Sequence, residues 1–179
     1  RVWRSQVTLV SQLERFPLHF NHAALVRSVI PPLMKLLECS NIPLQKAACR
    51  VLCSIGRQCT ETRSHEDIIR RFNNHFSCSE SCTLRKTFLL ACEEIMLTHS
   101  RRFGREIVVP IVTSMLDDLV ADVQRRALQL VPAMWKVLRP NADKDMMKAL
   151  LERLDLSAKS PRKYFSATAQ ELLAELDLL

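Results

Sequence analysis

Apolar residues recur along the chain with one spacing that appears five times. Each set starts at an apolar residue and continues 4, 7, 8 and 11 residues later, which places its members on one face of an α-helix. The starts lie 42, 40, 39 and 42 residues apart, at Val2, Leu44, Leu84, Val123 and Phe165. In the first set one member is polar. A period near 40 is typical of a solenoid built from helical hairpins.

A second apolar spacing precedes each of the four later sets. Its members follow the first residue at distances of 1, 4 and 8, and the copies begin at Val29, Ile68, Val108 and Met146. We name this helix A and the helix of the first pattern B. The patterns predict A helices over 22–37, 63–77, 103–117 and 142–155. They predict B helices over 2–15, 43–57, 82–98, 121–138 and 161–178.

These helices predict an all-α protein, an α-α superhelix of about four and a half hairpins. Only two of the 179 residues are glycine, and tight hairpins and phosphate-binding loops need glycine. We expect one continuous solenoid over residues 1–179, as a fragment of a longer protein. The expected repeats are 1–16 (second helix only), 22–58, 63–98, 103–138 and 142–179. No apolar run is long enough to predict a membrane-spanning helix.

Polar caps and prolines predict where several helices begin. Asn41 before Pro43, and Ser160 before Pro161, each combine a capping side chain with proline in the first turn. The acidic group after Asn141 predicts another start.

Gly56 lies near the end of its B helix and is expected to cap it. Pro31 and Pro110 occupy equivalent positions inside two A helices, where proline removes a backbone hydrogen bond and kinks the axis. Pro132 is expected to bend its B helix in the same way.

The repeat length and the A–B helix pair resemble HEAT repeats. The best local match is residues 107–138, with a proline-bent A helix, an Asp-containing turn, then Val, a basic region, Ala and Leu. The resemblance implies that Asp118 is the acid of the turn, whose usual partner is an arginine just after the valine. Gln124 stands at that arginine position. In other repeats the acid is replaced by Cys39, Ser79 and Ser160, so we expect this polar ladder between repeats to be largely absent.

Within HEAT proteins, the chain resembles the scaffold subunit of protein phosphatase 2A and HEAT-type regulatory subunits of protein phosphatase 4. The resemblance rests on Lys163-Tyr164-Phe165 followed by residues 169–172, and on Trp3-Arg4 at the start of a B helix. It implies a non-catalytic, protein-binding scaffold or regulatory subunit. In such scaffolds the B helices line the concave surface, and partners dock there and on the A–B turns.

Cations recur two residues after the start of four B sets, which places them on the same side of successive B helices. With neighbouring residues they form the candidate partner-binding set, Arg4, Lys46, Arg50, Arg85, Lys86, Asp118, Arg125, Arg126 and Lys163. They predict either a basic ridge that docks an acidic protein surface or a solvated face that pairs with nearby glutamates.

The net charge of +7 favours an acidic partner. We expect a phosphatase catalytic subunit or another acidic protein surface. The alternative is a HEAT module of a transport or nucleic-acid-associated assembly that uses the same basic ridge. Aromatic residues do not interleave with the cations as single-strand binding requires, so nucleic acid is the weaker expectation. Neither a membrane nor a small-molecule substrate is expected as a partner.

The seven cysteines are an odd number, and several fall inside helical patterns. Buried cysteine behaves as a small apolar residue, so we expect a reducing location, the cytoplasm or the nucleus.

The sequence predicts no enzyme, cofactor or metal site. His75, Cys78 and Cys82 lack the paired spacing of a zinc site. Side chains of the adjacent pairs Glu93-Glu94 and Asp117-Asp118 diverge around a helix, so they cannot converge on one reacting group. Asp117-Asp118 is instead expected to end an A helix and cap the turn.

Overall fold

The computed structural model describes residues 2–58 and 72–176. Over these residues the secondary structure consists of helices joined by turns, without a strand, which confirms the all-α helical-repeat prediction. The chain divides into two compact units, Arg1–His99 and Ser100–Leu179. One continuous solenoid over residues 1–179 stays a prediction. The predicted A helix over 63–77 lies mostly outside the described residues.

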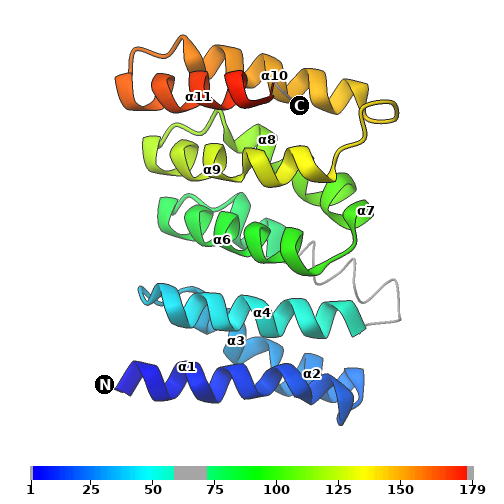
Figure 1. Ribbon diagram of the computed structural model, residues 1–179. Coiled ribbons are helices and arrows are strands. Elements are labelled where there is room, and N and C mark those ends of the chain that lie inside the picture. Colours follow the sequence, from blue (N-terminus) through cyan, green and yellow to red (C-terminus); the bar gives the residue numbers. More distant parts are fainter. Residues whose placement is uncertain (1, 59–71, 177–179) are drawn as a thin grey trace. The chain divides into compact units, whose positions relative to one another are not determined.

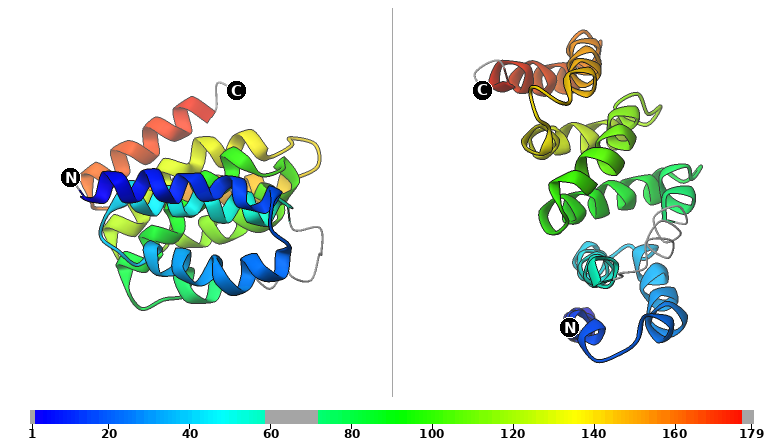
Figure 2. Two further views of the ribbon diagram at one scale, coloured as in Figure 1. Left: turned by 90° about the horizontal axis from the view of Figure 1, so that it is seen from below. Right: turned by 90° about the vertical axis from the view of Figure 1, so that its right-hand side faces the viewer.

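The first unit contains a row of B helices backed by A helices (Figure 1). Helix α4 contacts α1, α3 and α6, and the short segment η2 contacts α6. Figure 2 shows α1 and α4 in one layer, with α2 and α3 in a second layer. The elements are α1 (Val2–Gln12), the 3₁₀ segment η1 (Leu13–Leu18), α2 (His22–Ser28), α3 (Ile30–Leu37), α4 (Ile42–Gln58), the π-helical η2 (Asn73–Ser77) and α6 (Cys82–Thr98).

The second unit contains two stacked hairpins. Helix α8 packs on α9 and α10 packs on α11, while α10 also contacts α8 and α11 contacts α9. Like helices are therefore neighbours, as the repeat predicts. The elements are α7 (Arg101–Phe103), the π-helical η3 (Gly104–Val108), α8 (Val109–Met115), α9 (Ala121–Val137), α10 (Lys144–Ala158) and α11 (Lys163–Leu176).

The predicted apolar faces form the core. In α9 all five members of the set are buried, from Val123 to Met134. The pattern fails in part in α1, where Val10 is buried but Val2 and Leu9 are 75% and 63% exposed. An apolar set is fully buried where neighbouring helices cover its face, because removing apolar area from water stabilises the stack.

The A helices are interrupted near their prolines, as expected. Each proline lies in the first turn of the helix that follows the interruption, and not in the middle of a kinked helix. The A helix predicted over 22–37 is two helices that meet at Val29, and Pro31 is the second residue of α3. Pro110 is likewise the second residue of α8, directly after the π-helical turn. The first turn tolerates proline because its N–H has no partner within the helix. Pro132 lies inside α9, which continues through it.

The predicted cap at Gly56 and the predicted start at residue 161 are both wrong, although each lies within two residues of the observed helix end. Gly56 lies within α4, which continues to Gln58 with no positive-φ glycine among the described residues, so Gly56 does not end the helix. Helix α11 begins at Lys163 instead of residue 161, because Ser160 caps a local turn through Arg162 N (3.4 Å). The predicted cap at Asn41 is confirmed by its Oδ1, which accepts from Leu44 N at 3.0 Å.

None of the described helices combines the length and the apolar character that crossing a membrane demands.

Candidate functional site

In the first unit, two of the candidate cations join successive B helices. Arg50 of α4 lies 3.1 Å (Nε to Oε2) from Glu94 of α6, whose side chain is only 5% exposed. Lys46 lies 3.8 Å (Nζ to Oε2) from Glu93, one residue before. The side chains of Lys46 and Arg50 remain 40% and 56% exposed. Both cations therefore pair with nearby glutamates and still present charge to solvent.

A buried amide beside them links three elements. Gln45 Nε2 lies within hydrogen-bonding distance of the carbonyl oxygens of Leu37 (2.9 Å) and Cys39 (2.6 Å), and of Thr87 Oγ1 in α6 (3.1 Å). Gln45 and Thr87 are both buried. Because buried polar groups are costly without partners, this amide fixes the end of α3, the A–B turn and α6 together.

The other cations of the first unit lie on or near α1 and α6. Arg85 donates to the carbonyl oxygens of Ser79 (2.7 Å) and Glu80 (2.9 Å), which ties the turn before α6 to the helix. Lys86 is partly exposed. Arg4 stacks on Trp3, with its guanidinium carbon 5.4 Å from the ring centroid. Arg85 of α6 thus holds the turn before its own helix, whereas Arg4 lies on an exposed face of α1.

In the second unit, the candidate cations surround the start of α9 and α11. Arg125 pairs with Asp122 at 2.9 Å and its guanidinium carbon lies 6.0 Å from the ring centroid of Tyr164. Arg126 donates to Gln129 Oε1 at 2.9 Å, and Lys163 is exposed. Tyr164 is itself 66% exposed. Charge and an aromatic ring from successive B helices therefore lie together.

The A–B turn of the second unit also presents an apolar side chain. Asp118 Oδ1 accepts from Val120 N at 2.8 Å, which confirms that Asp118 caps this turn. Leu119, held between them, is 94% exposed. Turns of helical repeats project from the packed layers, so Leu119 is available to a partner.

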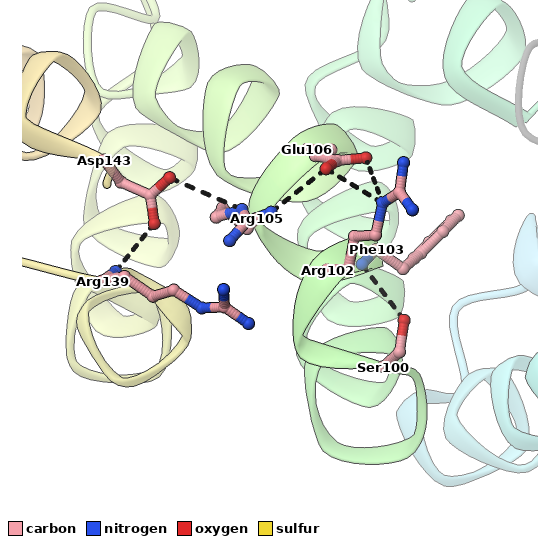
Figure 3. A network of polar contacts seen from close by, with 7 residues as sticks. All are labelled: Ser100, Arg102, Phe103, Arg105, Glu106, Arg139 and Asp143. Atoms are coloured by element: carbon pink, nitrogen blue, oxygen red, sulfur yellow. Dashed lines mark hydrogen bonds and ion pairs between the residues drawn. The ribbon is translucent and has the colours of Figure 1, made fainter. Parts of the chain in front are cut away.

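A polar network joins the π-helical turn of the second unit to the loop before α10 (Figure 3). Arg105 Nε lies 3.5 Å from Asp143 Oδ1, and Asp143 Oδ2 accepts from Arg139 N at 2.8 Å. A hydrogen bond from Arg102, and to a smaller extent one from Arg105, lowers the pKa of the Glu106 carboxyl group. Asp143 directly precedes α10 but makes no capping hydrogen bond to it, because its carboxylate contacts the loop N–H and the partly buried guanidinium of Arg105.

Among the described residues of the first unit, three thiols are buried: Cys49 and Cys53 of α4, and Cys92 of α6. Burial raises the pKa of the Cys53 thiol from 9.0 to about 12. Burial and neighbouring thiols raise the pKa values of Cys49 and Cys92 well above the usual range. These cysteines are packing residues and poor nucleophiles at neutral pH.

His75 lies 2.9 Å (Nε2) from Glu38 Oε1. The part of the chain that the structure describes holds no cluster of three His, Cys, Asp or Glu side chains that could bind a metal ion.

Sequence reasoning missed the polar contacts between successive repeats. Where the Asp–Arg ladder of HEAT repeats was expected to be largely absent, other polar pairs join successive repeats, Gln45 with Thr87 (3.1 Å) and Arg162 with Gln124 (2.9 Å). Partners in these pairs are 42 and 38 residues apart, close to the repeat period. Polar residues one period apart are therefore the signal that would have found them.

Comparison with known proteins also indicates similarity to helical-repeat proteins. Residues 22–57, which contain α2, α3 and most of α4, match the Armadillo/beta-catenin-like repeat family. The chain is 24% identical over 149 residues to serine/threonine-protein phosphatase 4 regulatory subunit 4 of Homo sapiens. The Mus musculus protein of the same name matches at the same identity and length. Each match covers 83% of this chain and 17% of the relative, so the chain spans about a sixth of these proteins.

The fold and the comparisons together confirm the resemblance to helical-repeat proteins and to a regulatory subunit of protein phosphatase 4. The chain is therefore an all-α helical-repeat protein that is similar, over 149 residues, to that regulatory subunit.

Proposed function

We propose that the chain is a non-catalytic, protein-binding scaffold or regulatory module of a serine/threonine phosphatase of the protein phosphatase 2A or 4 type. The observation that carries this proposal is the similarity over 149 residues to a regulatory subunit of protein phosphatase 4. Stacked helical hairpins offer an extended surface, which suits them to bind other proteins. We also propose that the protein acts in the cytoplasm or the nucleus, because free thiols buried in a core suit a reducing compartment.

The second unit offers the better docking surface. Leu119 and Tyr164 are 94% and 66% exposed. The exposed Lys163 precedes Tyr164 in the chain, and the guanidinium carbon of the exposed Arg125 lies 6.0 Å from the Tyr164 ring centroid. Exposed aromatic side chains and arginines are enriched in protein interfaces. The partner that fits is an acidic protein surface with an apolar side chain to set against Leu119.

In the first unit the cations serve two purposes. Glu93 and Glu94 hold Lys46 and Arg50 in place, which is a structural role. The exposed part of each side chain still contributes to a positive surface on α4. We therefore assign the main contribution to binding affinity to the second unit, and a contribution to the association rate to the first.

The test is affinity capture with the 179-residue chain as bait and a purified protein phosphatase 4 or 2A catalytic subunit as prey. Reversing charge at Lys46, Lys86 and Arg125 to Glu is expected to reduce capture at least tenfold. The matched control reverses three exposed cations of the A helices, Lys35, Arg101 and Lys148, with the same change in net charge. Capture by the control should stay within about threefold of the parent chain.

Two results would contradict the proposal. Equal loss in both variants would mean that net charge alone mediates binding. Capture of nucleic acid and not of the catalytic subunit would favour the alternative, a basic module of a transport or nucleic-acid-associated assembly. Circular dichroism of each variant checks that the helices are retained.

A further inference from the structure

The turn between α10 and α11 carries a sequence that the docking role does not account for. The chain has eight prolines, and only Pro161 follows a serine or threonine, Ser160. The basic residues Arg162 and Lys163 come next. Residues 160–162 lie outside both helices, and α11 begins at Lys163. Ser160 is partly exposed, and the three residues that follow are exposed.

A serine before proline, with a basic residue three positions on, matches the needs of one class of kinase. Proline has no backbone N–H, so a kinase groove that offers no acceptor at this position binds Ser-Pro without burying an unpaired donor. The residue before proline favours an extended backbone, the conformation in which kinases hold their substrates. Lys163 provides the positive charge at the third position.

Ser160 is partly exposed and makes few hydrogen bonds. The Ser160 N–H donates to the carbonyl oxygen of Ser157 (3.1 Å), and the hydroxyl makes one long contact with Arg162 N (3.4 Å). Lys163, the first residue of α11, is already exposed, and helix ends open at small cost in free energy, so the segment can be held in an extended conformation.

We propose that Ser160 is a phosphorylation site for a proline-directed serine/threonine kinase, and that the phosphate weakens docking on the second unit. The serine oxygen attacks the γ-phosphorus of ATP, forming the O–P bond while the bond from the γ-phosphorus to the bridging oxygen breaks. The serine proton passes to the base of the kinase, and ADP leaves. The second half of this proposal rests on the proposed function.

The neighbouring side chains explain why a phosphate would matter. Lys159, Arg162 and Lys163 surround Ser160 in sequence, and Arg162 Nη1 donates to Gln124 Oε1 of α9 at 2.9 Å. A phosphate carries about −1.5 to −2 charges at neutral pH and pairs strongly with arginine. It would offset much of the positive charge of this turn and compete with Gln124 for Arg162. Both changes act on the end of the unit where Arg125 and Tyr164 lie.

The site is tested by treating the 179-residue chain with a purified, active cyclin-dependent kinase and ATP, followed by intact mass and phosphopeptide mapping. We expect one phosphate, on Ser160, no label at this site in Ser160→Ala, and labelling at least tenfold slower in Pro161→Ala. Ser166→Ala, a partly exposed serine in α11 without a following proline, is the matched control and should label as the parent does. A peptide of residues 154–168 confirms that the kinase is active.

Each other result would overturn the assignment. Label in Ser160→Ala equal to that in the parent means that another residue is the acceptor. Label in the peptide but not in the folded chain means that the turn is closed to kinases. An unchanged rate in Pro161→Ala excludes the proline-directed class.

The effect on docking is measured with the phosphorylated and unmodified chains against the phosphatase catalytic subunit. We expect phosphorylation to weaken binding by about three- to tenfold. Unchanged affinity would overturn the regulatory half of the proposal alone. Failure of the unmodified chain to bind would overturn the proposed function and that half with it, while the mapping still decides whether Ser160 accepts phosphate.

Discussion

At the scale of single residues, buried polar and thiol groups show how the repeat pattern is stabilised. Glu94 has a side chain only 5% exposed, and its carboxylate is compensated by Arg50, which is more than half exposed. A buried carboxylate without a partner would cost several kcal/mol, so the pair is retained mainly because it prevents that loss. The same helices bring Cys49, Cys53 and Cys92 into the core as small apolar side chains.

The buried thiols are expected to resist alkylation in the folded protein. At pH 8, iodoacetamide should modify the exposed Cys78 at least tenfold faster than Cys49, Cys53 or Cys92, because only the thiolate reacts. Quantifying each cysteine by peptide mass spectrometry, in native buffer and in denaturant, measures this. Equal rates in native buffer would show that the α4–α6 interface opens readily.

The raised pKa of Cys53 also predicts a dependence of stability on pH. Its thiol titrates near 9.0 when exposed and near 12 in the folded chain, so the unfolded state loses its proton first. The stability that this thiol contributes is present in full below pH 9 and is lost as pH rises toward 12. Urea unfolding at pH 8 and pH 10 should show a smaller decrease in Cys53→Ala than in the parent chain.

At the scale of elements, side chains at one position of the repeat tie the A–B turns to the stack. Gln45, Arg85 and Gln124 each follow the first residue of a B set, and each makes a polar contact with a turn. The HEAT resemblance implies arginine and aspartate at these places. In the structure the acceptors at these places are backbone carbonyls and an amide oxygen, and the donors are Gln45, Arg85 and Arg162.

Replacing Gln45 by Met removes the donor while preserving the length of the side chain. The free energy of unfolding is expected to fall by about 1–3 kcal/mol, because the carbonyl oxygens of Leu37 and Cys39 lose a buried partner. Urea denaturation followed by circular dichroism measures the change. Gln12→Met, at an exposed position of α1, is the control and should change stability by less than about 0.5 kcal/mol. Similar values for both variants would show that the buried amide contributes little.

At the scale of the whole molecule, the formal charge of +7 is distributed over two units that both carry exposed cations. Some of these cations are held by acidic neighbours, as Arg125 is by Asp122, and others, such as Lys163, extend into solvent. The charge therefore favours an acidic partner of any class. Exposed apolar side chains beside it, above all Leu119, favour a protein.

The salt dependence of binding separates the two classes of partner. Raising salt from about 50 to about 200 mM would weaken phosphate-backbone binding through six to ten cations by roughly 10³–10⁵. Binding of the phosphatase catalytic subunit is expected to weaken by about tenfold or less, because apolar contacts are not screened. Fluorescence anisotropy with labelled catalytic subunit and with a labelled DNA duplex measures both. Tight duplex binding with the steeper slope would favour the nucleic-acid alternative.

The sequence by itself determined the helical repeat. Spacings of 4, 7, 8 and 11 residues predict the face of each B helix, and α4, α6 and α9 agree with the predicted bounds within one residue. This works because helix formation and burial of an apolar stripe are local properties of a few turns of chain. The candidate cations were also located by spacing, since residues at equivalent repeat positions share a face.

Only the tertiary structure decided which polar groups meet. Arg50 could equally have extended into solvent, and it pairs with Glu94 only because α4 and α6 pack side by side. The acids after Asn141 predicted a helix start, yet the carboxylate of Asp143 contacts Arg105 of another hairpin. Side-chain contacts of this kind depend on the register between helices far apart in sequence, which apolar periodicity does not specify.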